Sequence, residues 1–111
     1  MGLKTTNYVS KSMGVVLPEA YAVLTNLIVE TDNRARAIFA VQASREATKR
    51  YKAMDKVEVY FIWDRKTDPA KSAYEAAKTQ KREYTDYNPE TGEELAMTEY
   101  GTLYGWEDDI V

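Results

Sequence analysis

Three segments of the chain show the period-two alternation of apolar side chains that is typical of β-strands. In Ala20–Glu30 the apolar residues fall on both faces, whereas in Ala35–Ala43 they alternate with polar side chains. The third segment, Lys56–Trp63, again places its larger apolar residues on one side. Because Asp32-Asn33 suits a tight turn, the first two segments form a hairpin. The sequence therefore predicts an antiparallel meander of three or more strands.

A single helix is predicted after these strands. Asp68 is a good N-cap and Pro69 suits the first helical position, so the helix should run from Pro69 to about Lys81. Its apolar stripe is mostly Ala, which lets the helix lie close to a sheet and anchor through Tyr74.

A second hairpin is predicted beyond the helix. The turn-rich stretch 88–92 separates Glu83–Tyr87 from Glu94–Tyr100. The fold class that follows is α+β: a small antiparallel β-sheet with one α-helix and a C-terminal β-hairpin.

Length and composition limit the class of protein. A chain of 111 residues that is 44% hydrophobic fits one globular domain, residues 1–111. No apolar run approaches the length of a membrane span, and the N-terminus lacks the apolar stretch of a secretion signal, so no membrane partner and synthesis in a cytoplasm are expected. The absence of Cys excludes disulfides, and stability must come from packing.

Charge is unevenly distributed along the chain. Residues 1–82 carry 15 basic and 9 acidic side chains, a net charge of +6, whereas residues 83–111 carry nine carboxylates and no Lys or Arg. Several Tyr residues and a Trp are interleaved with these acids, which argues against a disordered acidic tail. We therefore interpret residues 83–111 as an acidic, aromatic interaction segment within the domain.

Enzymatic chemistry is disfavoured. The chain has no His and no Cys, the commonest general base, metal ligand and thiol nucleophile. Carboxylates do cluster at Glu93-Glu94 and at Glu107–Asp109, but a glycosidase pair needs one desolvated carboxyl held across a cleft. No spacing matches a calcium loop either. We predict no enzyme activity, no catalytic residue, no metal and no cofactor.

A basic stretch lies between the second and third predicted strands. It extends from Arg45 to Asp55 and is either a long surface loop or a short helix that begins at Ser44. Its four positive charges, the adjacent Lys56 and Tyr51 would suit nucleic acid electrostatically, yet the chain is acidic overall and no recognition motif is visible. Nucleic acid is thus the disfavoured partner. A partner-facing loop that meets the acidic end, in the same or the next subunit, is preferred.

Tyr and Trp residues concentrate in the last third of the chain. They supply rigid contact area with a polar group, so they either meet other subunits or stack on a saccharide. For Tyr74 and Tyr100 the simpler interpretation is completion of a small core, and for Trp106 packing and intermolecular contact are equally supported. The candidate interaction residues are Arg45, Lys49, Arg50, Lys52, Tyr84, Tyr87, Tyr100, Tyr104, Trp106, Glu107, Asp108 and Asp109.

The order of several short motifs resembles a group of small tail-tip or baseplate-region proteins of tailed siphophages that infect Gram-positive bacteria. The motifs are Met1-Gly2-Leu3-Lys4, the long hairpin Ala20 through Ala43, Ser44-Arg45-Glu46-Ala47, Val59-Tyr60-Phe61-Ile62-Trp63, Ala73-Tyr74-Glu75 and the acidic end Glu107-Asp108-Asp109-Ile110-Val111. The chain departs from that pattern by inserting Tyr84 to Thr102 between the helix and the acidic end.

This resemblance implies a virion or virion-assembly protein, located in the tail and assembled in the host cytoplasm. It implies a homo-oligomer that contacts other phage tail proteins, and it brings no residue-level binding site. Two alternatives are a receptor- or carbohydrate-binding module that recognises a host-surface saccharide, and an intracellular phage-encoded binding protein.

Overall fold

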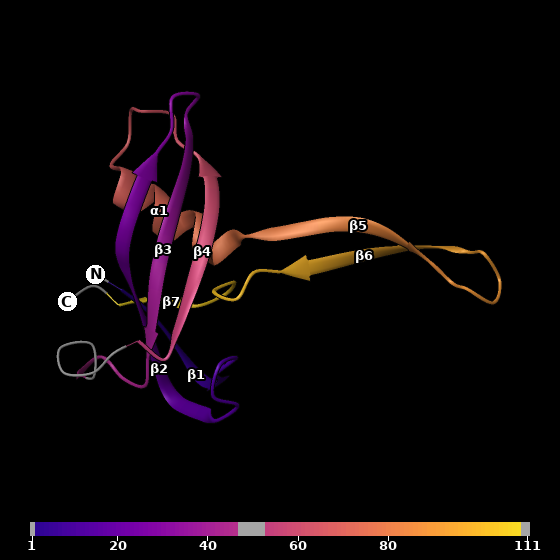
Figure 1. Cartoon of the computed structure of the whole chain (residues 1–111), viewed down its shortest axis with the longest axis horizontal. Helices are drawn as coiled ribbons and strands as arrows, with labels where there is room; N and C mark the ends of the chain where they lie inside the picture. Colours follow the sequence, from indigo (N-terminus) through magenta and orange to yellow (C-terminus); the bar gives the residue numbers. More distant parts are fainter. Residues whose placement is uncertain (1, 47–52, 110–111) are drawn as a thin grey trace.

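The computed structural model describes residues 2–46 and 53–109, and its main element is an antiparallel sheet of five strands in the order β4-β3-β2-β1-β7 (Figure 1). A separate two-stranded hairpin, β5-β6, lies outside this sheet. The elements in chain order are β1 (Gly2–Val9), β2 (Val16–Val29), β3 (Arg34–Gln42), β4 (Asp55–Ile62), α1 (Pro69–Thr79), β5 (Lys81–Tyr87), β6 (Glu94–Tyr100) and β7 (Glu107–Asp109). The α+β class predicted from the sequence is confirmed.

The meander of β2, β3 and β4 follows the alternation of the sequence. Ala37 on β3 pairs with Leu27 on β2 and with Val59 on β4. A β-bulge between Leu24 and Asn26 shifts the register of β2 once. Asn33 adopts a positive φ of 66° in the β2–β3 turn, a conformation that Asn tolerates better than most residues.

Two strands of the sheet, β1 and β7, were not predicted from the sequence. The middle of β1 is polar, at Lys4–Asn7, and β7 consists of three acidic residues, so neither shows an apolar alternation. Asn7 also has a φ of 56°, which interrupts the extended backbone within β1. Both strands form because a neighbouring strand hydrogen-bonds their backbone N–H and C=O groups. Tertiary pairing rather than local sequence therefore determines that these residues are extended.

Helix α1 packs on one face of the sheet through its alanines, as predicted. Asp68 caps it by accepting a hydrogen bond from the Ala70 backbone N–H at 3.0 Å. Ala73, Tyr74 and Ala77 are buried. The hydroxyl oxygen of Tyr74 accepts a hydrogen bond from Leu24 N at 2.9 Å. The Tyr74 ring meets Phe39 edge-on, with centroids 5.2 Å apart. The core therefore lies between α1 and the β2–β3–β4 face.

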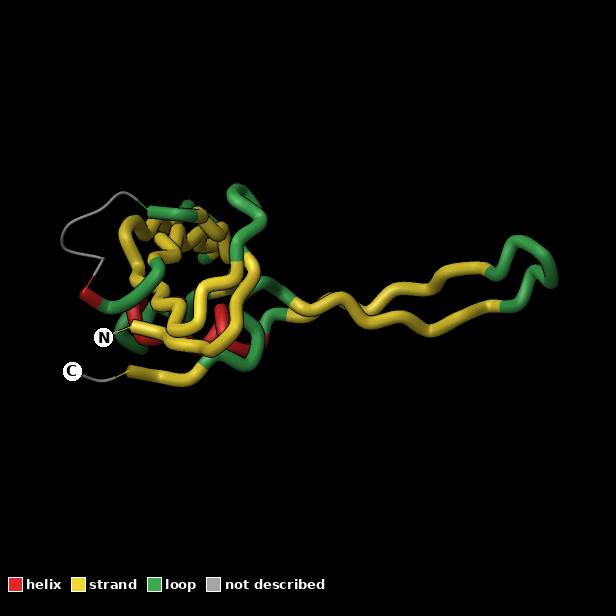
Figure 2. Tube along the Cα trace, turned by 90° about the horizontal axis from the view of Figure 1, so that it is seen from below, coloured by secondary structure: helices red, strands yellow, loops and turns green. Residues whose placement is uncertain are grey.

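The β5–β6 hairpin extends away from this body (Figures 1 and 2). The hairpin predicted at Glu83–Tyr87 and Glu94–Tyr100 is thus present, but its strands pair only with each other. It makes the molecule elongated, with principal extents of 52 × 38 × 20 Å. Within the described part of the chain, α1 is too short and too polar to cross a membrane.

Candidate interaction surfaces

The acidic segment after Arg82 separates into two parts with opposite environments. Its last part returns to the body, where β7 pairs antiparallel with β1, so that Gly2 lies opposite Asp109 and Lys4 opposite Glu107. Just before β7, Leu103 and Trp106 are buried in the core. The C-terminal end therefore folds back on its own subunit, a question that the sequence had left open.

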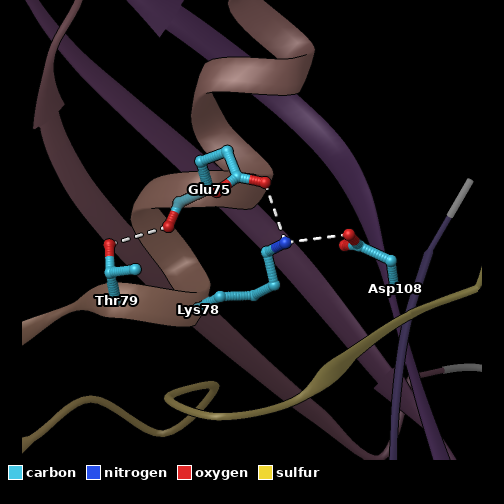
Figure 3. A network of polar contacts seen from close by, with 4 residues as sticks. All are labelled: Glu75, Lys78, Thr79 and Asp108. Carbon is cyan, nitrogen blue, oxygen red and sulfur yellow. Dashed lines mark hydrogen bonds and ion pairs between the residues drawn. The ribbon is translucent and has the colours of Figure 1, made fainter.

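One carboxylate of β7 is tied to the helix by a lysine (Figure 3). Lys78 Nζ donates hydrogen bonds to Asp108 Oδ2 and forms an ion pair with Glu75 Oε1, both at 2.8 Å. The hydrogen bond to Asp108, followed by that to Glu75, raises the pKa of Lys78. The ammonium thus stays charged and fixes the position of β7 against α1.

A second basic residue from the predicted interaction set also meets this end. Arg45 Nη1 lies 3.9 Å from Asp109 Oδ2, beside a pocket of about 450 Å³ that β1, β2 and β7 line. Burial raises the pKa of the nearby Tyr21, Asp109 raises it further and Arg45 opposes both. The predicted contact between the basic stretch and the acidic end is therefore present within one subunit at Arg45. The other basic candidates, Lys49, Arg50 and Lys52, lie outside the described residues.

The structure resolves the two alternatives for Trp106 and corrects the expectation for Tyr100. Trp106 is only 6% exposed and packs edge-on against Tyr8, with ring centroids 5.4 Å apart. This burial removes Trp106 from the surfaces that could meet a partner or a saccharide. Tyr100, expected to complete a core, is instead 57% exposed, because it lies at the base of the hairpin and contacts only Tyr104 among the described rings, at 4.5 Å.

The hairpin carries the remaining exposed candidates on two faces. Every residue of β5 and β6 is exposed. Tyr84 lies opposite Met97, and Asp86 lies opposite Leu95, so these four residues share one face. We call this set, Tyr84, Asp86, Leu95 and Met97, the Tyr84 face. Tyr87 and Tyr100 lie on the other face by the same alternation.

The tip of the hairpin is organised by its own hydrogen bonds. Asn88 Oδ1 accepts from Glu90 N at 2.9 Å, and Asn88 N donates to Glu93 O at 2.9 Å. Gly92 has a φ of +71°, a conformation that side chains disfavour, and its N–H donates to Asn88 O. At the base, Gly101 N donates to Gln80 O at 2.9 Å. Hydrogen bonds thus hold the hairpin at both ends, although no described residue of the body buries its strands.

Sequence analysis missed one buried polar residue, Asp55. Its carboxylate accepts hydrogen bonds from Tyr8 Oη at 2.6 Å, from Ser10 Oγ at 3.1 Å and from the backbone of Lys11 and Ser12. Burial acts to raise the pKa of Asp55, but these hydrogen bonds outweigh it and hold the pKa well below its usual range. The residue joins β4 to the β1–β2 connection and so has a structural role that no sequence spacing indicated.

Among residues 2–46 and 53–109, no three carboxylates gather closely enough to share a metal ion. In comparisons with known proteins, no protein-family model, curated protein or solved structure matches this chain. The feature that most needs a functional explanation is therefore the exposed hairpin.

Proposed function

We propose that this chain is a non-enzymatic structural protein of a bacteriophage tail, in the tip or baseplate region, that joins neighbouring subunits through its β5–β6 hairpin. The observation that carries the proposal is that every residue of both hairpin strands is exposed, including the apolar Tyr84, Leu95 and Met97 at 39–40%. An isolated two-stranded hairpin is only marginally stable in water. The apolar side chains of the Tyr84 face would be buried by contact with another molecule.

The phage assignment is supported by the order of motifs in the sequence. The hairpin occupies the inserted region, Tyr84 to Thr102, that departs from the typical pattern of the resembling tail-tip proteins. It would therefore give this chain a contact that typical members lack. Its acidic charge suits a basic neighbouring surface, either on another copy of the chain or on another tail protein.

The test compares two exposed methionines. Met97→Glu places a charge on the Tyr84 face, whereas Met13→Glu makes the same change on the body, where Met13 is also exposed. Light scattering over a range of concentrations, at low and high salt, should show weaker association for Met97→Glu alone. A wild-type chain that stays monomeric and has no affinity for purified tail-tip proteins would sink the proposal.

Truncation after Lys81 is a poor form of this test. It would also remove Leu103 and Trp106 from the core, so loss of assembly would be confounded with unfolding. Point substitutions on the hairpin leave these residues in place.

A host-surface saccharide is the second candidate ligand, because Tyr87 and Tyr100 present exposed rings on the same face of the hairpin. Since Trp106 is buried, stacking on sugar would depend on these two tyrosines. Pull-down with purified host cell walls should then be lost in Tyr87→Ala and Tyr100→Ala and kept in Met97→Ala. Binding that survives both tyrosine substitutions would reject this candidate.

A further inference from the structure

The five-stranded sheet has one face that α1 covers and one that it leaves open. On β3, Ala37 and Phe39 point to the covered face and are fully buried, so Arg36 and Ile38 belong to the open face by alternation. The strand register continues this face sideways, because Arg36 lies opposite Ile28 on β2 and opposite Tyr60 on β4. These three side chains form a row across three strands.

The open face combines exposed apolar side chains with a guanidinium. Tyr60 is 61% exposed, and Ile62, which follows two residues later on β4, is 75% exposed. Half-buried Arg36 forms no ion pair with any residue of the described ranges, whereas neighbouring Arg34 pairs with Asp32 at 2.8 Å. We call Ile28, Arg36, Tyr60 and Ile62 the open-face patch. Exposed apolar residues grouped around an unpaired charge are typical of contact surfaces.

The Tyr84 face of the hairpin has the complementary composition. It offers three apolar side chains and one carboxylate, Asp86, which forms no ion pair within the described residues. The hairpin, residues 81–100, carries six carboxylates against two basic residues, Lys81 and Arg82, so its field favours a basic acceptor. On the same two faces, Arg82 pairs with Glu99 and Glu58 accepts a hydrogen bond from Tyr60 Oη. Asp86 and Arg36 are thus the opposite charges that lack an ion pair within the described residues, each beside three apolar side chains.

We infer that the Tyr84 face of one copy packs on the open-face patch of a second copy, with Asp86 opposite Arg36. This inference rests on the proposed function and names the surface that receives the hairpin. The acceptor belongs to another copy because the hairpin leaves the end of α1 and extends away from its own body (Figure 2). Since the donor and acceptor surfaces differ, the contact is either exchanged mutually or continued from copy to copy.

A charge-swap experiment on the full chain tests the pairing. Arg36→Glu and Asp86→Arg should each weaken self-association by about ten- to hundredfold, as expected for loss of a charge-assisted hydrogen bond. The double variant, which restores opposite charges in reversed order, should associate within a few-fold of the wild type. Lys71→Glu provides the control, because exposed Lys71 lies on α1, which covers the opposite face of the sheet.

Cross-linking supplies an independent measurement that uses the absence of Cys from the chain. A mixture of the Asp86→Cys and Arg36→Cys variants should form a mixed disulfide dimer under mild oxidation. A mixture in which Met13→Cys takes the place of either variant should not form this dimer. Circular dichroism and urea unfolding confirm that each variant folds.

The possible outcomes separate the two proposals. If Met97→Glu weakens association while Arg36→Glu does not, and the mixed disulfide fails to form, the hairpin is a contact but its acceptor is not this patch. If the wild-type chain stays monomeric at every concentration, the second copy is wrong as the occupant. The broader proposal then stands only if Met97 is needed to bind tail-tip proteins.

Discussion

The body and the hairpin are built from the same secondary structure but bury very different amounts of side chain. In the body, strands β3 and β4 place Phe39, Val41 and Val59 in the core, with 1% exposure or less. In the hairpin, all fourteen residues of β5 and β6 remain exposed. Backbone pairing alone therefore does not distinguish a sheet that buries a core from a hairpin that stays exposed.

The same contrast divides the acidic residues. Asp108 and Asp109 at the chain end meet Lys78 and Arg45 of the body. Asp86 and the carboxylates of the hairpin tip have no such counterparts among the described residues. Asp108 and Asp109 thus stabilise the fold, whereas Asp86 and the carboxylates of the hairpin tip are assigned to the contact that we propose with a neighbouring molecule.

The largest effect on stability should come from the ring that closes the body. Trp106→Ala removes a buried side chain from its contact with Tyr8 and should lower the free energy of unfolding by about 3–5 kcal/mol. Urea denaturation followed by far-UV circular dichroism measures the change. Tyr87→Ala is the control, since its ring is exposed and its loss should change stability by less than about 0.5 kcal/mol. Equal effects would erase the distinction between body and hairpin.

The next effect concerns the buried carboxylate of the body. Asp55→Asn replaces an acceptor of four hydrogen bonds and should lower the free energy of unfolding by about 1–3 kcal/mol. Because the folded state lowers the pKa of Asp55, the unfolded state binds more protons as the pH falls. The wild type should lose this contribution below about pH 4, the usual pKa of Asp.

Stability measured against pH checks the Asp55 prediction. The difference between wild type and Asp55→Asn should be full near neutral pH and should shrink on acidification. Substitution of Asp86 by Asn, on the hairpin, is the comparison and should leave the profile unchanged. A constant difference between wild type and Asp55→Asn down to pH 2 would contradict the assigned role.

A smaller effect is expected for the ion pair that holds β7. Asp108→Asn should lower the free energy of unfolding by about 0.5–1 kcal/mol, because Lys78 and Asp108 are both partly buried. Glu83→Gln is the control: Glu83 lies 3.9 Å from Lys81 on the exposed hairpin, and its loss should not be measurable. Repeating both measurements in high salt should reduce the Asp108 effect, since salt screens the pair.

The smallest effect on folding should come from the face that we assign to association. Tyr84→Ala removes a ring that Arg82 covers at 5.1 Å, but the site is exposed, so the unfolding free energy should change by less than about 0.5 kcal/mol. Self-association should nevertheless weaken. A large loss of stability in dilute, monomeric protein would show that the hairpin and the body unfold together.

The sequence predicted those parts of the fold that carry their own local signal. Alternation defined β2, β3 and β4 to within a few residues, Asp68-Pro69 located the start of α1, and the turn-rich stretch 88–92 located the hairpin. It also indicated that Arg45 and the acidic end belong together. These features depend on the period of a strand, a cap or a turn, which neighbouring residues specify.

Tertiary structure alone decided the environment of each candidate residue. Polar β1 became a strand because it pairs with β2 and β7, acidic β7 because it completes the sheet edge, and Asp55 became an acceptor because the β1–β2 connection reaches it. Trp106 and Tyr87 are both aromatic residues with one adjacent acid, yet one is buried and the other exposed. Burial depends on residues brought together from distant parts of the chain, and no local pattern records those contacts.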